Sequence, residues 1–203
     1  MGIYISGLIA IAVFSGTGVM AAERKKMDIF SVVVLGLITA LAGGSMRDVL
    51  LGRYPVFWIG DVNYFWTSLI ASLFFFFFTK IPFLSYKTLL IADAVGVSMF
   101  NIQALEMTLN LKYPGEIAVL MGIITGVAGG IVRDVLTQEK PLLLKRELYA
   151  IPLLLGGVVY IFLKSLGVWP AAVFWSGIFS AFLLRLAAIQ YKLYFPEVFI
   201  YKK

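Results

Sequence analysis

The sequence predicts an all-α membrane protein with seven transmembrane helices, built as two inverted three-helix repeats plus a seventh helix. The prediction rests on composition, on a regular alternation of apolar segments and loops, and on an internal repeat. Of the 203 residues, 61% are hydrophobic and 14% are charged, and the mean hydropathy is +0.96. A soluble domain carries roughly 45–50% apolar and about 25% charged residues. This chain has too few charged side chains to cover a water-facing surface, so we expect one transmembrane domain over residues 1–203.

Seven segments have the apolar character and length of membrane-spanning helices, which need about 20 residues each. Turn-forming residues such as Gly52, Pro82, Pro114 and Pro141 separate them. The first segment has its basic residues after the apolar stretch rather than before it, so we expect a retained helix and not a cleaved signal. The predicted spans are about 3–22, 28–51, 62–80, 87–106, 114–137, 148–166 and 169–191, with repeat 1 over about 1–82, repeat 2 over about 87–167 and the seventh helix over about 169–191.

Lysine and arginine gather on one side of these spans. The loops after the first, third and fifth spans and the C-terminal tail hold 11 basic residues, whereas the opposite loops hold 3. Because cytoplasmic loops are enriched in Lys and Arg, we expect a multi-pass protein of the cell membrane with its N-terminus outside and its C-terminus in the cytoplasm. The net charge of +6 therefore indicates no nucleic-acid partner. The larger set is Arg24, Lys25, Lys26, Lys80, Lys87, Lys140, Lys145, Arg146, Lys192, Lys202 and Lys203, and the smaller set is Arg53, Lys112 and Lys164.

The chain contains no cysteine and no histidine. Disulfides, thiolate metal sites and thiol nucleophiles are therefore excluded, as are the most frequent general base and metal ligand. Since no convincing pair of nucleophile and base is present, we expect no enzyme activity, no bound metal and no cofactor.

An internal repeat fixes the expected architecture. Shifting the chain by 86 residues superposes residues 36–50 on 122–136, and 10 of these 15 positions are identical, including a Gly-Gly pair and an Arg-Asp pair. The same shift places Phe14 on Phe100. Each unit holds three spans, so the second unit enters the membrane from the opposite side. We therefore expect a pseudo-two-fold axis in the membrane plane, as in many transporters.

The paired glycines Gly43–Gly44 and Gly129–Gly130 lie well inside the spans 28–51 and 114–137. Adjacent glycines weaken a helix and allow it to bend, and carbonyls freed at a bend can replace part of the water shell of a cation. Small residues spaced by four along both spans also favour close helix packing. We expect a functional bend in addition to packing.

Arg47–Asp48 and Arg133–Asp134 follow the glycines. A charge at the bilayer centre costs at least about 2.5–3.5 kcal/mol, so these side chains must be paired or hydrated. Neighbours on a helix point in different directions, which disfavours pairing within each Arg-Asp dipeptide. We expect crossed pairs, Arg47 with Asp134 and Arg133 with Asp48, that line a path and hold its walls; a purely structural ion pair is the alternative.

Two further charged residues lie in apolar segments. Asp93 has no acidic counterpart in the first repeat, where Gly7 stands. It is a candidate cation contact or proton site, and the alternative is that it caps a broken helical segment. Arg185 is near a helix end, so we expect its long side chain to reach the membrane interface.

The doubled Gly-Gly-x-x-Arg-Asp sequence resembles the motif of the prokaryotic branch of the trimeric intracellular cation (TRIC) channel family. The family motif has a third glycine in front, where Ala42 and Ala128 stand here. The resemblance covers nearly the whole chain, including the segment around Asp93. It implies a homotrimer with one ion pathway in each protomer, permeable to K⁺ and to some Na⁺. The implied pathway residues are Gly43, Gly44, Arg47, Asp48, Gly129, Gly130, Arg133 and Asp134, to which the residue-level argument adds Asp93.

The first functional expectation is a passive channel for monovalent cations, lined by glycine-broken helices. The second is a small-solute transporter of the glycine type, because related bacterial domains have been described as glycine transporters and inverted repeats are common among carriers. Discrete single-channel currents distinguish the first from the second.

Overall fold

The computed structural model describes residues 2–78 and 85–194. Seven helices follow the seven predicted spans, and a short helix, α3, is an addition that the sequence did not predict. The break at Ile81–Pro82 and the residues Lys80, Lys202 and Lys203 lie outside the described residues. In chain order the elements are α1 (Gly2–Arg24), α2 (Ile29–Leu50), α3 (Phe57–Gly60), α4 (Val62–Phe78), α5 (Tyr86–Asn110), α6 (Gly115–Leu136), the 3-10 turn η1 (Leu142–Leu144), α7 (Ala150–Ser165) and α8 (Pro170–Tyr191).

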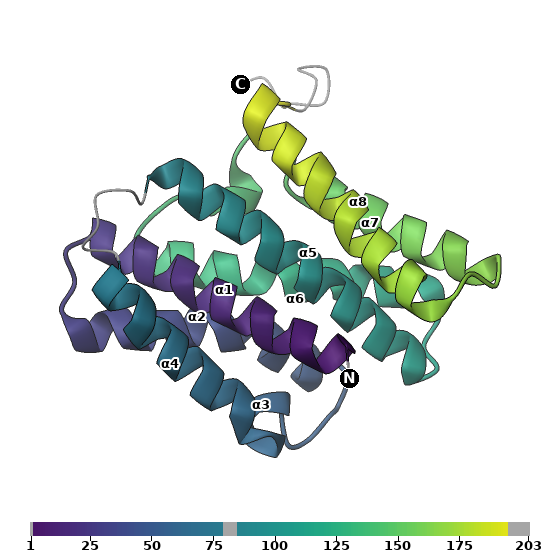
Figure 1. Ribbon diagram of the computed structural model, residues 1–203, viewed down its shortest axis with the longest axis horizontal. Coiled ribbons are helices and arrows are strands. Elements are labelled where there is room, and N and C mark those ends of the chain that lie inside the picture. The colour runs from purple at the N-terminus through teal and green to yellow at the C-terminus, as the bar shows by residue number, and fades with distance from the viewer. Residues whose placement is uncertain (1, 79–84, 195–203) are drawn as a thin grey trace.

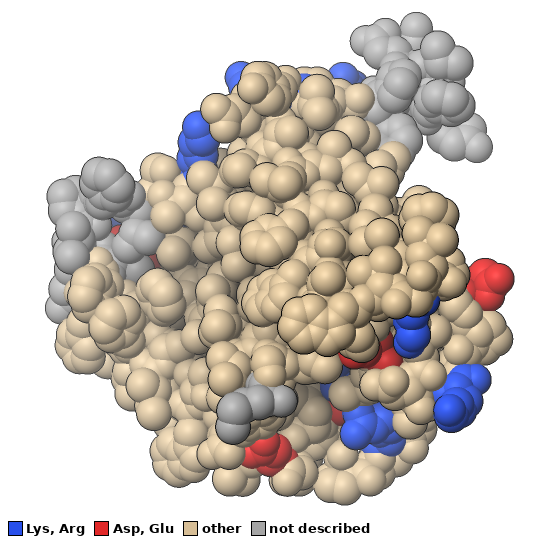
Figure 2. Space-filling model, turned by 45° about the vertical axis from the view of Figure 1, so that its right-hand side comes forward, with Lys and Arg blue, Asp and Glu red and all other residues tan. Residues whose placement is uncertain are grey.

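The helices differ in how well they match a membrane crossing. By length and composition α1, α2, α5, α6 and α8 can span a bilayer. The apolar helices α4 and α7 are shorter, with 17 and 16 residues. Large apolar side chains such as Phe30 and Phe162 are exposed on the outside of the bundle. The face drawn in Figure 2 is mostly uncharged, and its charged side chains gather toward the rim. The protein is therefore an all-helical, multi-pass membrane protein.

The helices pack as two similar groups of three. In the first group α1, α2 and α4 contact one another, and in the second α5, α6 and α7 do the same. The groups meet mainly where α2 packs on α6 and where α1 packs on α5, while α8 lies against α7 and α5. Figure 1 shows α1 and α4 on one side of the bundle and the α7–α8 pair on the other. Every helix pair of the first group thus has a counterpart in the second.

Capping residues fix where the helices begin. Asp28 precedes α2, and its carboxylate accepts hydrogen bonds from the backbone N–H of Ser31 at 3.0 Å and from the Ser31 hydroxyl at 2.7 Å. Ser85 caps α5 in the same way through the N–H of Thr88. These side chains satisfy donors that the first turn of a helix leaves unpaired. Their position in the loops keeps both helix starts at the surface of the bundle.

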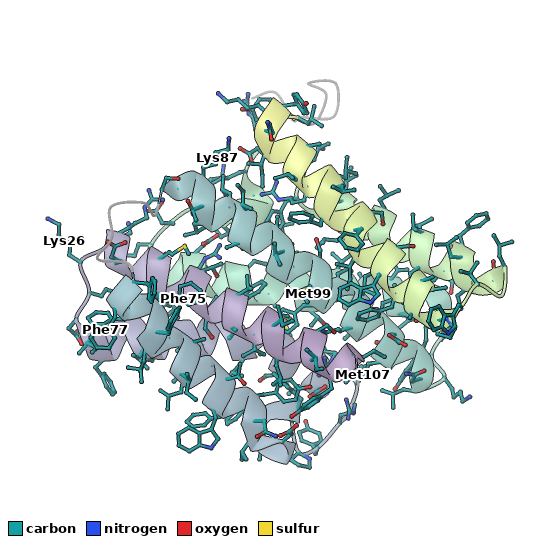
Figure 3. All side chains as sticks on the ribbon, viewed as in Figure 1. Lys26, Phe75, Phe77, Lys87, Met99 and Met107 are labelled. Carbon is teal, nitrogen blue, oxygen red and sulfur yellow. The ribbon has the colours of Figure 1, made fainter. Side chains whose placement is uncertain are left out.

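Two opposite ends of the bundle can be distinguished by their loops. At the end that we call the basic end, Lys25 pairs with Glu139 at 2.6 Å and Lys145 donates a hydrogen bond to Tyr86. These contacts bring together the loop after α1, the start of α5 and the loop after α6. Lys26 and Lys87 project from this end, whereas Met107 lies toward the N-terminus of α1, at the end that we call the far end (Figure 3). The basic loops therefore share one end of the molecule, as the sequence predicted.

Candidate ion pathway

The paired glycines lie where α2 crosses α6, and both helices continue through them. The helical backbone of α2 runs unbroken from Ile29 to Leu50 and that of α6 from Gly115 to Leu136. The expected break in the two helices is therefore wrong, whereas a functional bend of the continuous helices at the glycines stays a prediction. Tertiary packing keeps each helix intact in spite of the weak helix propensity of glycine, and the glycines serve another purpose.

That purpose is close approach of two backbones. A Cβ atom on Gly43 would clash with the carbonyl oxygen of Thr125, and one on Gly129 would clash with the carbonyl oxygen of Thr39. Gly43 and Gly129 are equivalent under the 86-residue shift, as are Thr39 and Thr125. The contact is thus reciprocal. The later residue of each pair in one helix meets the earlier residue in the other, so the two helices cross with opposite chain directions. Only residues without a side chain permit helices to approach this closely.

Each Arg-Asp dipeptide is paired within itself. Arg47 Nε donates to Asp48 Oδ1 at 2.9 Å, and Arg133 Nε donates to Asp134 Oδ1 at 2.8 Å. The expected crossed pairs between the repeats are therefore wrong. The arginine side chain is long enough to fold back onto the next residue, and each dipeptide lies near the C-terminal end of its helix. The different directions of the two Cβ atoms therefore do not prevent an Arg and an adjacent Asp side chain from pairing.

The second oxygen of each aspartate holds the chain that follows the helix. Asp48 Oδ2 accepts the backbone N–H of Phe57 at 2.8 Å, and Asp134 Oδ2 accepts the backbone N–H of Leu142 at 2.9 Å. Each carboxylate therefore joins its arginine to the segment after α2 or α6. A charged acceptor makes these backbone contacts stronger than neutral ones.

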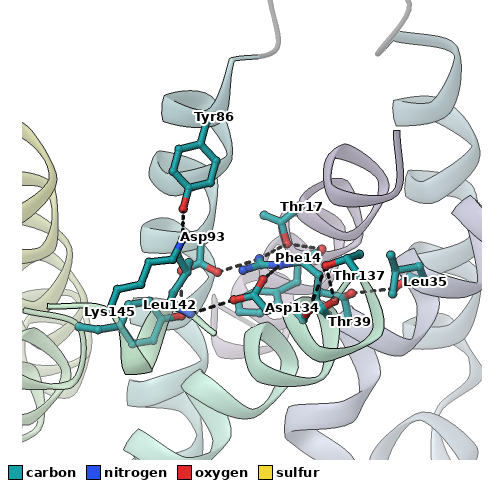
Figure 4. A network of polar contacts seen from close by, with 12 residues as sticks. Phe14, Thr17, Leu35, Thr39, Tyr86, Asp93, Asp134, Thr137, Leu142 and Lys145 are labelled. Atoms are coloured by element: carbon teal, nitrogen blue, oxygen red, sulfur yellow. Dashed lines mark hydrogen bonds and ion pairs between the residues drawn. The ribbon is translucent and has the colours of Figure 1, made fainter. Parts of the chain in front are cut away.

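Asp93 completes a buried network around Arg133 (Figure 4). Arg133 Nη1 donates to Asp93 Oδ1 at 2.9 Å and to Thr17 Oγ1 at 3.0 Å, and the Tyr149 hydroxyl donates to Asp93 Oδ2 at 2.8 Å. Neither the Asp93 nor the Arg133 side chain is exposed at all. The network joins α1, α5, α6 and the residue preceding α7. With two aspartates around one guanidinium, it carries a net negative charge.

The matching region of the first repeat has a different charge. Gly7 stands where Asp93 would be, so Arg47 has Asp48 as its ion-pair partner and lies over the ring of Phe57 at 5.5 Å. A second cation, Arg53, approaches Asp48 Oδ1 at 3.6 Å. Two guanidiniums around one carboxylate give this region a net positive charge. The two copies of the motif are thus alike in geometry and opposite in charge.

Arg185 of α8 does not reach the membrane interface as expected. Its side chain is 1% exposed, lies over the Tyr149 ring at 4.6 Å and donates from Nη1 to the carbonyl of Leu148 at 3.0 Å. Glu147 approaches the same guanidinium at 3.7 Å. The reason is that internal partners satisfy the charge, so a route to water is not needed. Through Tyr149, α8 also touches the buried network.

Cavities open toward the motif from both ends of the bundle. The far-end cavity, of about 540 Å³, reaches Gly44, Arg47 and Phe100. The basic-end cavity, of about 240 Å³, reaches Asp134 and Leu142 and is rimmed by Arg24, Lys25, Glu139, Lys140 and Lys145. The hydrogen bond and charge of Lys25 hold the pKa of Glu139 below its ordinary value.

The layer between the cavities is packed. Phe14 and Phe100 occupy equivalent positions in the two repeats, and their rings meet edge to face with centroids 5.2 Å apart. The Phe14 ring also lies where a Cβ on Gly96 or Gly129 would be. Together with the Asp93–Arg133 pair, these rings close the space between the two cavities.

The structure brings most of the predicted site residues to this layer. Gly43, Gly129, Gly130, Arg133 and Asp93 lie in or beside it, whereas Gly44, Arg47 and Asp48 lie toward the far-end cavity and Asp134 toward the basic-end cavity. Sequence analysis missed Tyr149, which donates to Asp93, and Glu106, which lines the far-end cavity. A tyrosine before a helix resembles an interfacial residue, so Tyr149 carried no signal. Glu106 could have been found as an acidic residue inside a predominantly apolar helix.

Comparisons with known proteins agree with this geometry. A family model described as Glycine transporter matches residues 4–80 and 90–165, segments whose starts differ by the same 86 residues as the two motifs. A UPF0126 membrane protein of Vibrio cholerae is 39% identical over 195 residues, which cover 96% of this chain and 82% of the relative. The UPF0126 inner membrane protein YadS of Escherichia coli is 36% identical over 200 residues, which cover 97% and 96%.

Solved structures give the same result. The TRIC trimeric intracellular cation channel orthologue from Rhodobacter sphaeroides matches with a TM-score of 0.90 and 38% identity, over 94% of this chain and 98% of that chain. A structure solved to explain conductance through TRIC cation channels matches with a TM-score of 0.85 and 34% identity, over 98% of both chains. Sequence and fold agree over nearly the full length, and the chain therefore belongs to the prokaryotic TRIC family, whose matching model is described as Glycine transporter.

Proposed function

We propose that the protein is a channel for monovalent cations, K⁺ and to some extent Na⁺, with one pathway through each protomer. The observation that carries the proposal is the match to the Rhodobacter sphaeroides TRIC cation channel orthologue, at 38% identity and a TM-score of 0.90. The matched structure is described as trimeric, which supports a homotrimer for this chain as well.

The proposed pathway joins the two cavities through the packed layer. Gly43, Gly44, Gly129 and Gly130 line the crossing of α2 and α6, where backbone carbonyls come within reach of a passing ion. Pairing within each of the dipeptides Arg47–Asp48 and Arg133–Asp134 offsets the arginine charge along the pathway, while Arg53 adds positive charge beside Asp48 and Asp93 adds negative charge beside Arg133. Opening requires the Phe14 and Phe100 rings and the Asp93–Arg133 pair to move apart. In this proposal the packed layer is the closed part of the pathway.

The proposed topology has seven crossings. The reciprocal contact between Gly43 and Gly129 and the similar packing of the two helix groups support inverted repeats over about 1–82 and 87–167, with α8 as the seventh crossing. The clustering of Lys and Arg at the basic end supports a cytoplasmic C-terminus and an external N-terminus. A homotrimer in a cell membrane is the proposed assembly.

A second candidate is a small-solute transporter of the glycine type. The description of the matching family model favours it, and a closed layer between two cavities suits a carrier that opens one side at a time. The two candidates use the same helices and differ in whether both cavities ever connect.

Reconstitution of the purified protein into planar bilayers tests the proposal. A channel gives discrete current steps in KCl that carry far more than about 10³ ions per second, the pace of millisecond conformational cycles. Saturable glycine uptake into liposomes without such steps would replace the channel by the carrier. Replacing KCl by a salt of a large organic cation should abolish the steps.

A further inference from the structure

The far-end cavity is lined by two arginines and by a glutamate that makes no ion pair within the described part of the chain. Arg47 of α2 and Arg53 of the following loop line it, as does Glu106 of α5. Both arginines lie beside Asp48, at 2.8 Å and 3.6 Å. Among the residues that the structure describes, Glu106 makes no ion pair within 4.0 Å. Cationic and anionic side chains therefore line one cavity, with Asp48 offsetting part of the arginine charge and Lys164 interacting favourably with Glu106.

Glu106 has an oxygen that can accept a further donor. The Tyr160 hydroxyl lies near its carboxylate, whereas Oε2 is buried and has no hydrogen-bond partner. A buried acceptor that is left unpaired destabilises the folded protein, and more so when it is charged. Such groups in native proteins need a specific explanation. A ligand that carries an ammonium group provides one.

Neighbouring amides extend this acceptor wall. Gln103 and Asn110 stand three before and four after Glu106, which places all three on one face of α5, and all three line the cavity. Carboxylate and amide oxygens accept hydrogen bonds from an ammonium group, which has three donors. A guanidinium offers a planar fork that matches a carboxylate. The two walls thus suit the two ends of an amino acid.

The size and lining of the cavity indicate what side chain the ligand carries. Its volume of about 540 Å³ falls in the usual range of ligand sites, roughly 300–1,000 Å³. Glycine would leave much of it unfilled. Phe57, Phe100 and Leu111 add apolar surface to the lining, which favours an apolar side chain on the ligand.

We propose that the far-end cavity binds a zwitterionic α-amino acid with an apolar side chain, for which leucine is the probe. Arg53 receives the carboxylate, Glu106 receives the ammonium group, and the side chain packs against Phe57 and Phe100. The inference deepens the second candidate function by naming a wider substrate class than glycine. Binding itself does not depend on transport or on current.

Calorimetric titration of the full-length protein in detergent tests the proposal with leucine and two analogues. In 3-methylbutylamine the carboxylate is absent, and in 4-methylpentanoate the ammonium group is absent. Loss of a charge-assisted hydrogen bond weakens binding by about tenfold or more. We therefore expect leucine to bind at least about tenfold more tightly than either analogue, and more tightly than glycine.

Two variants test which residue binds each end of the ligand. Glu106→Gln should weaken leucine and 3-methylbutylamine and leave 4-methylpentanoate unchanged. Arg53→Gln should weaken leucine and 4-methylpentanoate and leave 3-methylbutylamine unchanged. The analogue that each variant still binds shows that the variant is folded. Glu116→Gln, an exposed position at the start of α6 that does not line the cavity, should bind all three ligands as the parent does.

Three results would overturn the proposal: no heat from leucine with the folded protein, equal affinity for leucine and 3-methylbutylamine, or unchanged leucine binding in Glu106→Gln. Equal affinity for leucine and 3-methylbutylamine would show that the cavity recognises only the ammonium group. Flux and current are measured separately on the same preparation. If neither flux nor current is observed and leucine still binds, the proposed channel and transporter functions are wrong, whereas the binding site is supported.

Discussion

Asp93 and Arg133 form an ion pair at 2.9 Å in which neither side chain has any exposed surface. The aspartate comes from α5 and the arginine from α6, and the hydroxyl groups of Thr17 and Tyr149 complete the contact. Arg133 also pairs with Asp134 at 2.8 Å, so removal of the Asp93 charge takes away one charge-assisted contact, which is worth about 1.5–3 kcal/mol. The pair therefore holds α5 against α6 within the second helix group, and the contact with Thr17 of α1 links it to the first group.

The first prediction concerns this pair. Asp93→Asn keeps the shape of the side chain and removes its charge while Asp134 still pairs with Arg133, so we expect the protein to lose about 1.5–3 kcal/mol of unfolding free energy. Tyr149→Phe removes one hydroxyl and should cost about 1 kcal/mol. Asp61→Asn, a half-buried position between α3 and α4, is the control and should match the parent. Thermal unfolding in detergent gives the ranking, and an Asp93→Asn variant as stable as the parent would show that the pair does not hold the layer.

The second prediction separates close approach from flexibility at the glycines. Gly43→Ala and Gly129→Ala place a methyl group against a backbone carbonyl that cannot rotate away. We expect each to cost about 1–3 kcal/mol, and by similar amounts because the contact is reciprocal. At Gly130 the nearest atoms to a Cβ are the Tyr149 hydroxyl at 3.3 Å and Asp93 Oδ1 at 3.4 Å, so Gly130→Ala should cost less.

Gly60→Ala is the control for these variants, since the nearest atom to its Cβ is 3.7 Å away. The measurement is the unfolding free energy in a denaturing detergent titration. If helix flexibility were the reason for the glycines, Gly130→Ala would change the unfolding free energy as much as Gly129→Ala does.

Much of the fold followed from local patterns. Apolar segments of the right length, with Pro and Gly between them, gave helix positions close to those observed, because helix formation in an apolar chain depends on residues near one another. The repeat predicted two groups of three helices, and α1, α2 and α4 contact one another as α5, α6 and α7 do. The alternation of basic loops predicted which loops share an end. These features need no knowledge of side-chain positions.

The partners of the buried charges could not be predicted in the same way. Asp93 and Arg133 are 40 residues apart, and only the packing of α5 on α6 brings them together. The crossed pairing failed because it considered helix directions and ignored the reach of the arginine side chain. The helix break failed because local propensity is weaker than tertiary packing. Glycine signals either bending or close approach, and the sequence does not distinguish them.

The third prediction tests the pairing within each Arg-Asp dipeptide. A double-mutant cycle between Arg47→Gln and Asp48→Asn should give a coupling energy of at least about 1 kcal/mol, because the side chains are in direct contact. A cycle between Arg47→Gln and Asp134→Asn should be additive within about 0.5 kcal/mol. The unfolding free energies of the single and double variants supply both values. Strong coupling between Arg47 and Asp134 instead would restore the crossed arrangement.

The fourth prediction concerns pH at the basic end. The hydrogen bond and the positive charge of Lys25 lower the pKa of Glu139 from its ordinary value of 4.5. An acid whose pKa falls on folding stabilises the folded protein above its unfolded pKa. The stabilisation is lost as the pH drops below 4.5 and through the lowered value. Both side chains are substantially exposed, so high salt should weaken the effect.

Lys25→Gln removes the hydrogen bond and the charge, so the pKa of Glu139 should rise back toward 4.5. Nuclear magnetic resonance of the labelled glutamate carboxyl in detergent micelles follows the titration directly. Lys26→Gln is the matched control, because Lys26 is exposed and is not among the groups that lower this pKa. Should Lys26→Gln raise the pKa as much as Lys25→Gln does, the general positive potential of the basic end would be the cause, and the contact between Lys25 and Glu139 would not.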